Sequence, residues 1–147
     1  MLEAEKDIGT IFDGLLVSDE NESQGRLKLL QYLGILPLSR ICDLGSGSGE
    51  FAKYLADYKY KVTAYENISY KLTNLFSKLK YADNSNLKII PMQFSQHTKT
   101  EKYDCITAFR YFSYLTDTQF EEEICHIFES LKEGGYLVAS HSQFVLE

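Results

Sequence analysis

The chain has 147 residues, of which 44% are hydrophobic and 24% are charged. This length and apolar content suffice for one buried core but not for two ordinary domains, so residues 1–147 are expected to form a single domain. The formal net charge of −6, without any block of Lys or Arg, argues against a nucleic-acid partner, because neutralising phosphates requires a basic surface.

The amino-terminal residues show no targeting signal. Carboxylates stand at Glu3 and Glu5, where a signal peptide would be basic, and no apolar run in the chain is long enough to span a bilayer. The sequence therefore predicts a cytoplasmic protein without a membrane partner. Residues 8–17 are too apolar for a free tail, whereas the acidic stretch 19–22 is expected to be a solvated loop.

Helical and strand patterns alternate along the rest of the chain. Helices are predicted at about 23–34, from 51 onward, at about 68–80 and at about 117–132, the last one ended by Gly134 and Gly135. Strands are predicted at 40–44, 61–65, 87–92, 103–109 and 136–140. This order indicates an α/β fold, a Rossmann-like doubly wound and mainly parallel sheet with helices on both faces.

The apolar faces of these helices should lie against the sheet. The residues predicted on the buried faces of the last two helices are Leu72, Leu75, Phe76 and Leu79, then Phe120, Ile124, Ile127, Phe128 and Leu131. Three cysteines, Cys42, Cys105 and Cys125, are far apart and form no C-x-x-C pair, so neither a metal site nor a disulfide is expected.

A glycine-rich loop joins the first strand to its helix, in the run Asp43-Leu44-Gly45-Ser46-Gly47-Ser48-Gly49. Glycines there permit positive φ and let a ligand approach the backbone at the start of a helix. A phosphate-binding P-loop would continue with Lys and then Ser or Thr, but Glu50 and Phe51 follow. The dinucleotide fingerprint would require a third glycine at position 50, so NAD and FAD fit poorly.

A carboxylate follows the second strand at the distance expected for a nucleotide site. Glu66 ends the run 61–66, about 20 residues beyond the first glycine, where nucleotide-binding α/β folds place the acid that binds the ribose hydroxyls. Glu66 is therefore the predicted ribose ligand, the alternative being an ordinary exposed Glu at a strand end.

The pattern of an acid, one residue and then G-x-G-x-G closely resembles the first motif of the class I S-adenosylmethionine-dependent methyltransferases. The resemblance covers about residues 25–142 and implies S-adenosyl-L-methionine as cofactor, with a cofactor-binding core at 38–142 and a helical lid or cap at 1–34. Asp43 with the backbone of Gly45 and Gly47 would hold the methionine end. The cofactor-binding residues so expected are Asp43, Gly45, Ser46, Gly47, Gly49, Glu66, Asn67, Ile68, Gln93, Phe94 and Phe109.

Two departures from the family pattern bear on the cofactor and the acceptor. Many members place an Asp after the third strand for the adenine amino group, where this chain has Gln93 and Ser95 nearby. The Asn/Asp-Pro-Pro-Tyr/Phe motif of methyltransferases acting on nucleic-acid bases is absent, and Phe109 to Phe112 stand in its place. The resemblance therefore implies methyl transfer to a small molecule or a protein side chain. The rival reading is a non-catalytic binding or partner subunit, and an NAD-linked oxidoreductase is the third.

Methyl transfer needs a general base only when the acceptor starts protonated, so no catalytic residue is assigned. The candidates for such a base are His97, Tyr111 and His141, and His126 is expected to be solvated. Arg110 directly follows a buried strand at the site. It is expected either to bind a carboxylate or phosphate of the acceptor, or to pair with Glu121 or Glu122.

Family members usually continue beyond the fifth strand, whereas this sequence ends at Leu146 and Glu147. The sheet is therefore expected to be shortened after that strand, which would leave an open apolar edge. A partner chain, a homodimer or a further segment is expected to cover Tyr136 and Val138 there.

Overall fold

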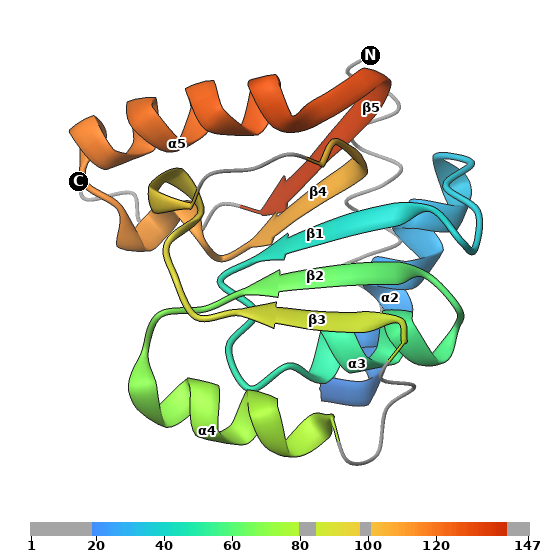
Figure 1. The fold of residues 1–147 in the computed structure, drawn as a ribbon. Coiled ribbons are helices and arrows are strands. Elements are labelled where there is room, and N and C mark those ends of the chain that lie inside the picture. The colour runs from blue at the N-terminus through green and yellow to red at the C-terminus, as the bar shows by residue number, and fades with distance from the viewer. Residues whose placement is uncertain (1–18, 80–84, 98–100, 141–147) are drawn as a thin grey trace, which may run out of the picture.

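The structure, a computed structural model, describes residues 19–79, 85–97 and 101–140. Its centre is a five-stranded parallel sheet in the order β3-β2-β1-β4-β5 (Figure 1). The strands are β1 (Arg40–Leu44), β2 (Lys61–Tyr65), β3 (Leu87–Ile90), β4 (Tyr103–Phe109) and β5 (Leu131–Ser140). The chain starts in the middle, runs to one edge and returns to build the other, so the predicted doubly wound fold is confirmed.

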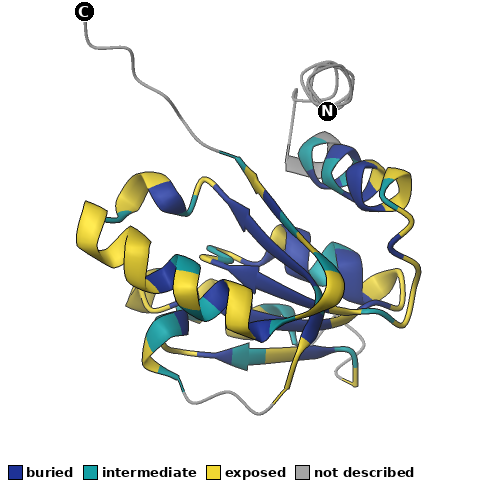
Figure 2. Cartoon of the chain, turned by 90° about the horizontal axis from the view of Figure 1, so that it is seen from above, coloured by how far each residue is buried: buried dark blue, intermediate teal, exposed yellow. Residues whose placement is uncertain are grey.

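Helices cover both faces of the sheet (Figure 1). The helices α2 (Asp19–Tyr32), α3 (Glu50–Asp57) and α4 (Ser69–Lys78) pack on one face. The helix α5 (Asp117–Ser130) and two short 3-10 turns, η1 (Phe94–Gln96) and η2 (Phe112–Tyr114), lie on the other. Burial is concentrated in the strands and on the inner sides of the helices (Figure 2).

The two cores arise from the alternation of side chains along the buried strands. In β1, Ile41 belongs to the core beneath α3, and its neighbour Cys42 belongs to the core beneath α5. In β4, Cys105 and Ile106 divide in the same way. Both cysteines are buried thiols, so they act as small apolar side chains, as predicted.

Three aromatic residues predicted to face the sheet are exposed instead. Phe76 is 45% exposed, Phe120 is 40% exposed and Phe128 is 63% exposed. The buried face of α5 is formed by Glu123, Ile127 and Ser130, and only Leu75 is fully buried on α4. Each helix covers only a narrow part of the sheet, so the outer members of an apolar set remain in solvent.

The boundary between α5 and β5 also differs from the prediction. The helix ends at Ser130 and β5 begins at Leu131, so Gly134 and Gly135 lie within the strand rather than at the helix end. A Cβ at Gly135 would lie 2.9 Å from the backbone oxygen of Lys132 and 3.1 Å from that of Asp104. Pairing of β4 with β5 shifts register in this region, so the glycine accommodates close backbone approach in an irregular ladder.

The acidic stretch 19–22 is the first turn of α2 and not a loop, which corrects the prediction. Residues 8–17 and His141 lie outside the described residues. Of the lid or cap expected at 1–34, the structure describes the part from residue 19 onward, which contains α2.

No helix in the described ranges combines the length and apolar character that crossing a bilayer would require. Within those ranges, no three metal-ligating side chains come together as a site.

Candidate functional site at the strand ends

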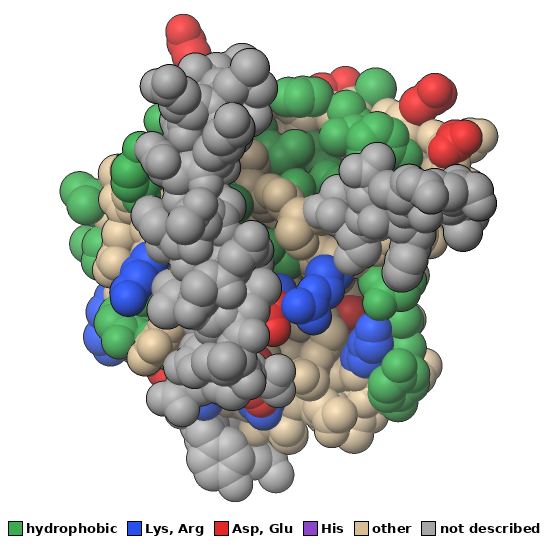
Figure 3. Space-filling model, turned by 180° about the vertical axis from the view of Figure 1, so that it is seen from behind, with side chains coloured by type: hydrophobic (Ala, Val, Ile, Leu, Met, Phe, Trp, Pro, Cys, Tyr) green, Lys and Arg blue, Asp and Glu red, His purple; other side chains and the backbone are tan. Residues whose placement is uncertain are grey.

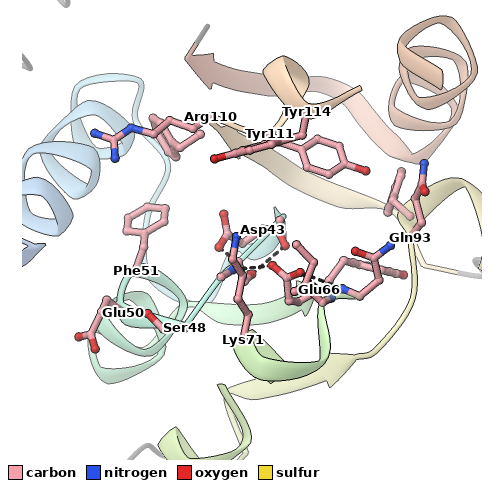
Figure 4. Close-up of a pocket in the computed structure, with 18 of the residues that line it drawn as sticks. Asp43, Ser48, Glu50, Phe51, Glu66, Lys71, Gln93, Arg110, Tyr111 and Tyr114 are labelled. Carbon is pink, nitrogen blue, oxygen red and sulfur yellow. Dashed lines mark hydrogen bonds between the residues drawn. The ribbon is translucent and has the colours of Figure 1, made fainter. Parts of the chain in front are cut away.

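A cavity of about 490 Å³ lies at the carboxyl ends of β1, β2 and β4. Ten predicted residues line it: Asp43, Gly45, Ser46, Gly47, Glu66, Asn67, Ile68, Gln93, Phe94 and Phe109. Gly49 lies behind the lining, against α4. In Figure 4, Phe51 stands at one end, Asp43 and Glu66 follow, and Gln93 stands at the other end. Residues from several distant parts of the chain thus share one site.

The three loop glycines all have positive φ, at 63° for Gly45, 61° for Gly47 and 87° for Gly49. Among the described residues, no atom lies within 4 Å of a Cβ built at Gly47, so its missing side chain leaves the cavity open. A Cβ at Gly45 would lie 2.7 Å from Cδ1 of Tyr111, and one at Gly49 would overlap the side chain of Leu75. Gly47 makes room for a ligand, whereas Gly45 and Gly49 make room for the protein itself.

Asp43 is buried beneath the loop at the end of β1. Its Oδ1 accepts a hydrogen bond from Oγ1 of Thr107 at 2.7 Å, and its Oδ2 accepts one from Oγ of Ser46 at 2.8 Å. Burial raises the pKa of Asp43, while the bonds from Thr107 and Ser46 oppose that shift. The Ser46 amide also donates to the carbonyl of Tyr65 at 3.1 Å, which ties the loop to β2. Ser46 therefore shapes the loop and orients the carboxylate.

Glu66 is 5% exposed, yet it lines the cavity. Its Oε1 accepts the amide of Gly47 at 2.8 Å, and its Oε2 accepts the amides of Asn67 and Ile68 at 3.0 Å each. A carboxylate oxygen can accept two bonds, so Oε1 retains capacity for a ligand hydroxyl. The Gly47 amide, expected at the methionine end, instead donates to Glu66.

A partly buried arginine that the sequence did not single out lies on the wall formed by α2. The guanidinium of Arg26 lies 4.3 Å from the ring centroid of Phe109 and 5.5 Å from that of Phe51, and it pairs with Glu22. Burial lowers the pKa of Arg26, opposed by the charges of Glu22 and Asp43. Its Nε is buried and has no hydrogen-bond partner among the described residues. No motif marks Arg26, because only the packing of α2 brings it to the site.

Arg110 has a left-handed backbone, with φ of 58°, immediately after β4. Its Nη2 lies 3.2 Å from Oε1 of Glu22, and its amide donates to Oγ of Ser140 at 2.9 Å. The predicted pairing with Glu121 or Glu122 is wrong, since the side chain reaches α2 whereas those glutamates lie on α5, across the sheet. Strained backbone of this kind is concentrated at functional sites.

Of the three candidates for a general base, only Tyr111 lines the cavity among the residues described. Burial raises the pKa of Tyr111, and the charge of Glu123 adds to the shift, so the phenol stays protonated and can donate. His97 lies outside the lining and its Nδ1 is 2.8 Å from the hydroxyl of Tyr65. Other lining residues that the sequence did not single out are Ser23, Ser48, Lys71, Leu115 and Gln119.

Comparison with known proteins supports a common family. A family model described as a methyltransferase domain matches residues 18–143. No curated protein sequence matches the chain.

Solved structures of methyltransferases share the fold. The glycopeptide N-methyltransferase MtfA has a TM-score of 0.69 at 16% identity, covering 83% of this chain and 53% of its own. The N-methyltransferase NodS from Bradyrhizobium japonicum WM9 has a TM-score of 0.70 at 22% identity, covering 86% and 72%. An S-adenosylmethionine-dependent methyltransferase from Clostridium acetobutylicum has a TM-score of 0.71 at 20% identity, covering 92% and 56%.

The chain spans about half the length of MtfA and of the clostridial enzyme. The match of the family model over most of the sequence agrees with the sheet order, with the glycine loop and with the two buried carboxylates, Asp43 and Glu66, at the cavity. The chain therefore belongs to the methyltransferase-domain family, and S-adenosylmethionine is the cofactor that its glycine loop and two buried carboxylates fit.

Proposed function

We propose that this chain is a methyltransferase that binds S-adenosylmethionine in the cavity and transfers its methyl group to a small molecule or a protein side chain. One observation carries the proposal. Two buried carboxylates, Asp43 and Glu66, face a cavity of about 490 Å³ beside the open position at Gly47. Asp43, which lies beneath the glycine loop, would repel the pyrophosphate of a dinucleotide, whereas S-adenosylmethionine has no phosphate and carries positive charge on its ammonium group and its sulfur.

The residues present fit the parts of this cofactor in order along the cavity. Asp43 would attract the ammonium group, and Arg26 would bind the carboxylate next to it through charge-assisted hydrogen bonds. Glu66 would accept the ribose hydroxyls, and the amide of Gln93 would meet the adenine amino group. Ser95 is the weaker candidate for that contact, because Gln93 lines the cavity and Ser95 does not.

The cofactor supplies an electrophilic methyl group on sulfur, and the protein's task is positioning. Transfer proceeds by in-line displacement, so holding the acceptor atom collinear with methyl and sulfur can supply most of the acceleration. Tyr111 and Tyr114 line the cavity above Glu66 in Figure 4, and Lys71 lies 5.6 Å from the ring centroid of Tyr114. These side chains would bound the acceptor side of the site, with the phenol of Tyr111 as a donor.

The charge distribution on one face of the molecule favours a small or protein acceptor over a nucleic acid. On the face shown in Figure 3, the described basic side chains are interspersed with acidic ones and form no continuous basic patch. MtfA and NodS are N-methyltransferases, so amines are the acceptor class to assay first.

Titration calorimetry should show whether the cavity binds S-adenosylmethionine or NAD. We expect S-adenosylmethionine and S-adenosylhomocysteine to bind with micromolar-range dissociation constants and NAD to give no measurable heat of binding. Radiolabelled methyl transfer to an amine library then tests turnover. Preferential binding of NAD would reject the proposal, and cofactor binding without transfer to any acceptor would favour a non-catalytic binding subunit.

A homodimer or partner subunit at β5 is a second part of the proposal, because in the described part of the chain β5 pairs only with β4. Tyr136 is 43% exposed at this edge, whereas Val138, also predicted to await a partner, is already buried by its own chain. An uncovered strand edge invites pairing with another chain. Light scattering over a dilution series should give a mass above the monomer, and methyl transfer should fall as the assembly dissociates. A soluble monomer with unchanged turnover would contradict the assembly.

A further inference from the structure

A third buried carboxylate, Glu123, does not line the cavity but stands behind its wall. Glu123 on α5 is 0% exposed, and its Oε1 accepts two hydrogen bonds at 3.0 Å. One donor is the backbone amide of Ser95, and the other is Nε2 of Gln93. Its Oε2 has no hydrogen-bond partner among the described residues. Burying a carboxylate costs free energy, so one that binds only η1 and the Gln93 side chain is expected to have a function.

These two bonds decide which end of the Gln93 amide faces which way. Oε1 of Glu123 acts as an acceptor, and it has room for a second hydrogen bond beside the one from the Ser95 amide. Only the NH₂ end of the Gln93 amide can donate, so that end points to Glu123. The carbonyl oxygen is then the end turned away from Glu123. Without such a partner, a glutamine amide can present either its donor or its acceptor end to a ligand.

Gln93 itself lines the cavity, at the end beyond Glu66 (Figure 4). In the proposed placement of the cofactor, Glu66 takes the ribose and the base extends toward Gln93. A fixed carbonyl acceptor there matches the 6-amino group of adenine and opposes a 6-oxo group, which is also an acceptor.

We infer that Glu123 is a positioning residue, which orients the Gln93 amide so that the site selects a 6-aminopurine cofactor. The inference rests on the proposed function. Gln93 is the side chain that determines the specificity. With its NH₂ end held by Glu123, it presents only its carbonyl oxygen, a hydrogen-bond acceptor, to the base.

The test compares two ligands within each variant. Calorimetry measures the dissociation constants of S-adenosylhomocysteine and of S-inosylhomocysteine, which carries a carbonyl in place of the 6-amino group. We expect the wild type to bind S-adenosylhomocysteine about tenfold or more tightly than S-inosylhomocysteine. The amino group of the first ligand can donate a hydrogen bond to the Gln93 carbonyl, whereas the carbonyl of the second would face another acceptor. In Glu123→Met, the preference should fall to within about threefold, because the freed amide can turn to suit either base.

Glu123→Gln is the matched control. Its side-chain carbonyl can still accept from Ser95 and Gln93, so the preference should be retained. The ratio of the two constants cancels a general weakening of the site, which a purely structural role would cause. If Glu123→Met does not fold, Glu123→Asp, whose carboxylate is one methylene shorter, takes its place.

The outcomes separate the inference from its foundation. Wild-type protein that binds neither ligand would reject the proposed function. Wild-type protein that prefers S-adenosylhomocysteine while the Glu123 variants keep the same ratio would reject the positioning role alone. Loss of the preference in Glu123→Met, with retention in Glu123→Gln, supports the inference.

Discussion

Replacing Glu66 by alanine should weaken the binding of S-adenosylhomocysteine by about 1–3 kcal/mol, through loss of charge-assisted bonds to the ribose hydroxyls. The three backbone amides that Glu66 accepts would lose their partner at the same time, which loosens the loop at Gly47. Calorimetry on the variant gives the change directly. Glu50→Gln is the control, because Glu50 also lines the cavity but is exposed and pairs with Lys78.

A second ligand shows which part of the cofactor each residue binds. Methylthioadenosine has the adenine and ribose of the cofactor but lacks the amino-acid group. Glu66→Ala should weaken both ligands, whereas Arg26→Met should weaken S-adenosylhomocysteine and leave methylthioadenosine nearly unchanged. Equal losses for both ligands in Arg26→Met would mean that Arg26 supports the wall of the cavity and does not bind the carboxylate.

Alanine substitutions at three glycines should separate backbone strain, steric overlap and ligand space. All three positions have positive φ, which costs an alanine about 1–2 kcal/mol. Gly34→Ala should show that cost alone, because a Cβ there has no described atom within 4 Å. Gly49→Ala should cost about 2–5 kcal/mol, since the new methyl group must also displace Leu75, which is fully buried.

Gly47→Ala should be destabilised only as much as Gly34→Ala, yet it should lose most of its affinity for the cofactor because its methyl group enters the cavity. Urea unfolding measures the stability of each variant, and calorimetry on the folded proteins measures binding. A Gly49 variant as stable as the Gly34 variant would show that Leu75 can move aside. Normal binding in the Gly47 variant would place the ligand elsewhere.

The short-range features of this protein are readable in its sequence. The loop from Asp43 to Gly49 was predicted to join strand to helix, and it does so with all three glycines at positive φ. Positive φ is a local steric property, so glycine spacing reports it without knowledge of the fold. Glu66 followed from spacing in a repeated strand–helix unit, and the unit places strand ends at one edge of the sheet.

The predictions of which helix residues are buried against the sheet were less successful. Phe120 and Phe128 fit a helical apolar face, but α5 buries the narrower stripe that contains Glu123. A buried glutamate looks the same in a sequence as a solvated one, and its partners are about 30 residues away at Gln93 and Ser95. Only packing of α5 on η1 reveals it.

The sequence by itself determined the parallel sheet, the strand-to-helix loop and the row of residues at the strand ends, because apolar periodicity and glycine spacing express local steric and hydrophobic preferences. The tertiary structure alone decided that Arg26 reaches the cavity, that Arg110 turns to Glu22 and that Glu123 holds Gln93. Those contacts join side chains from separate elements, and their energies depend on burial and distance, which no local pattern encodes.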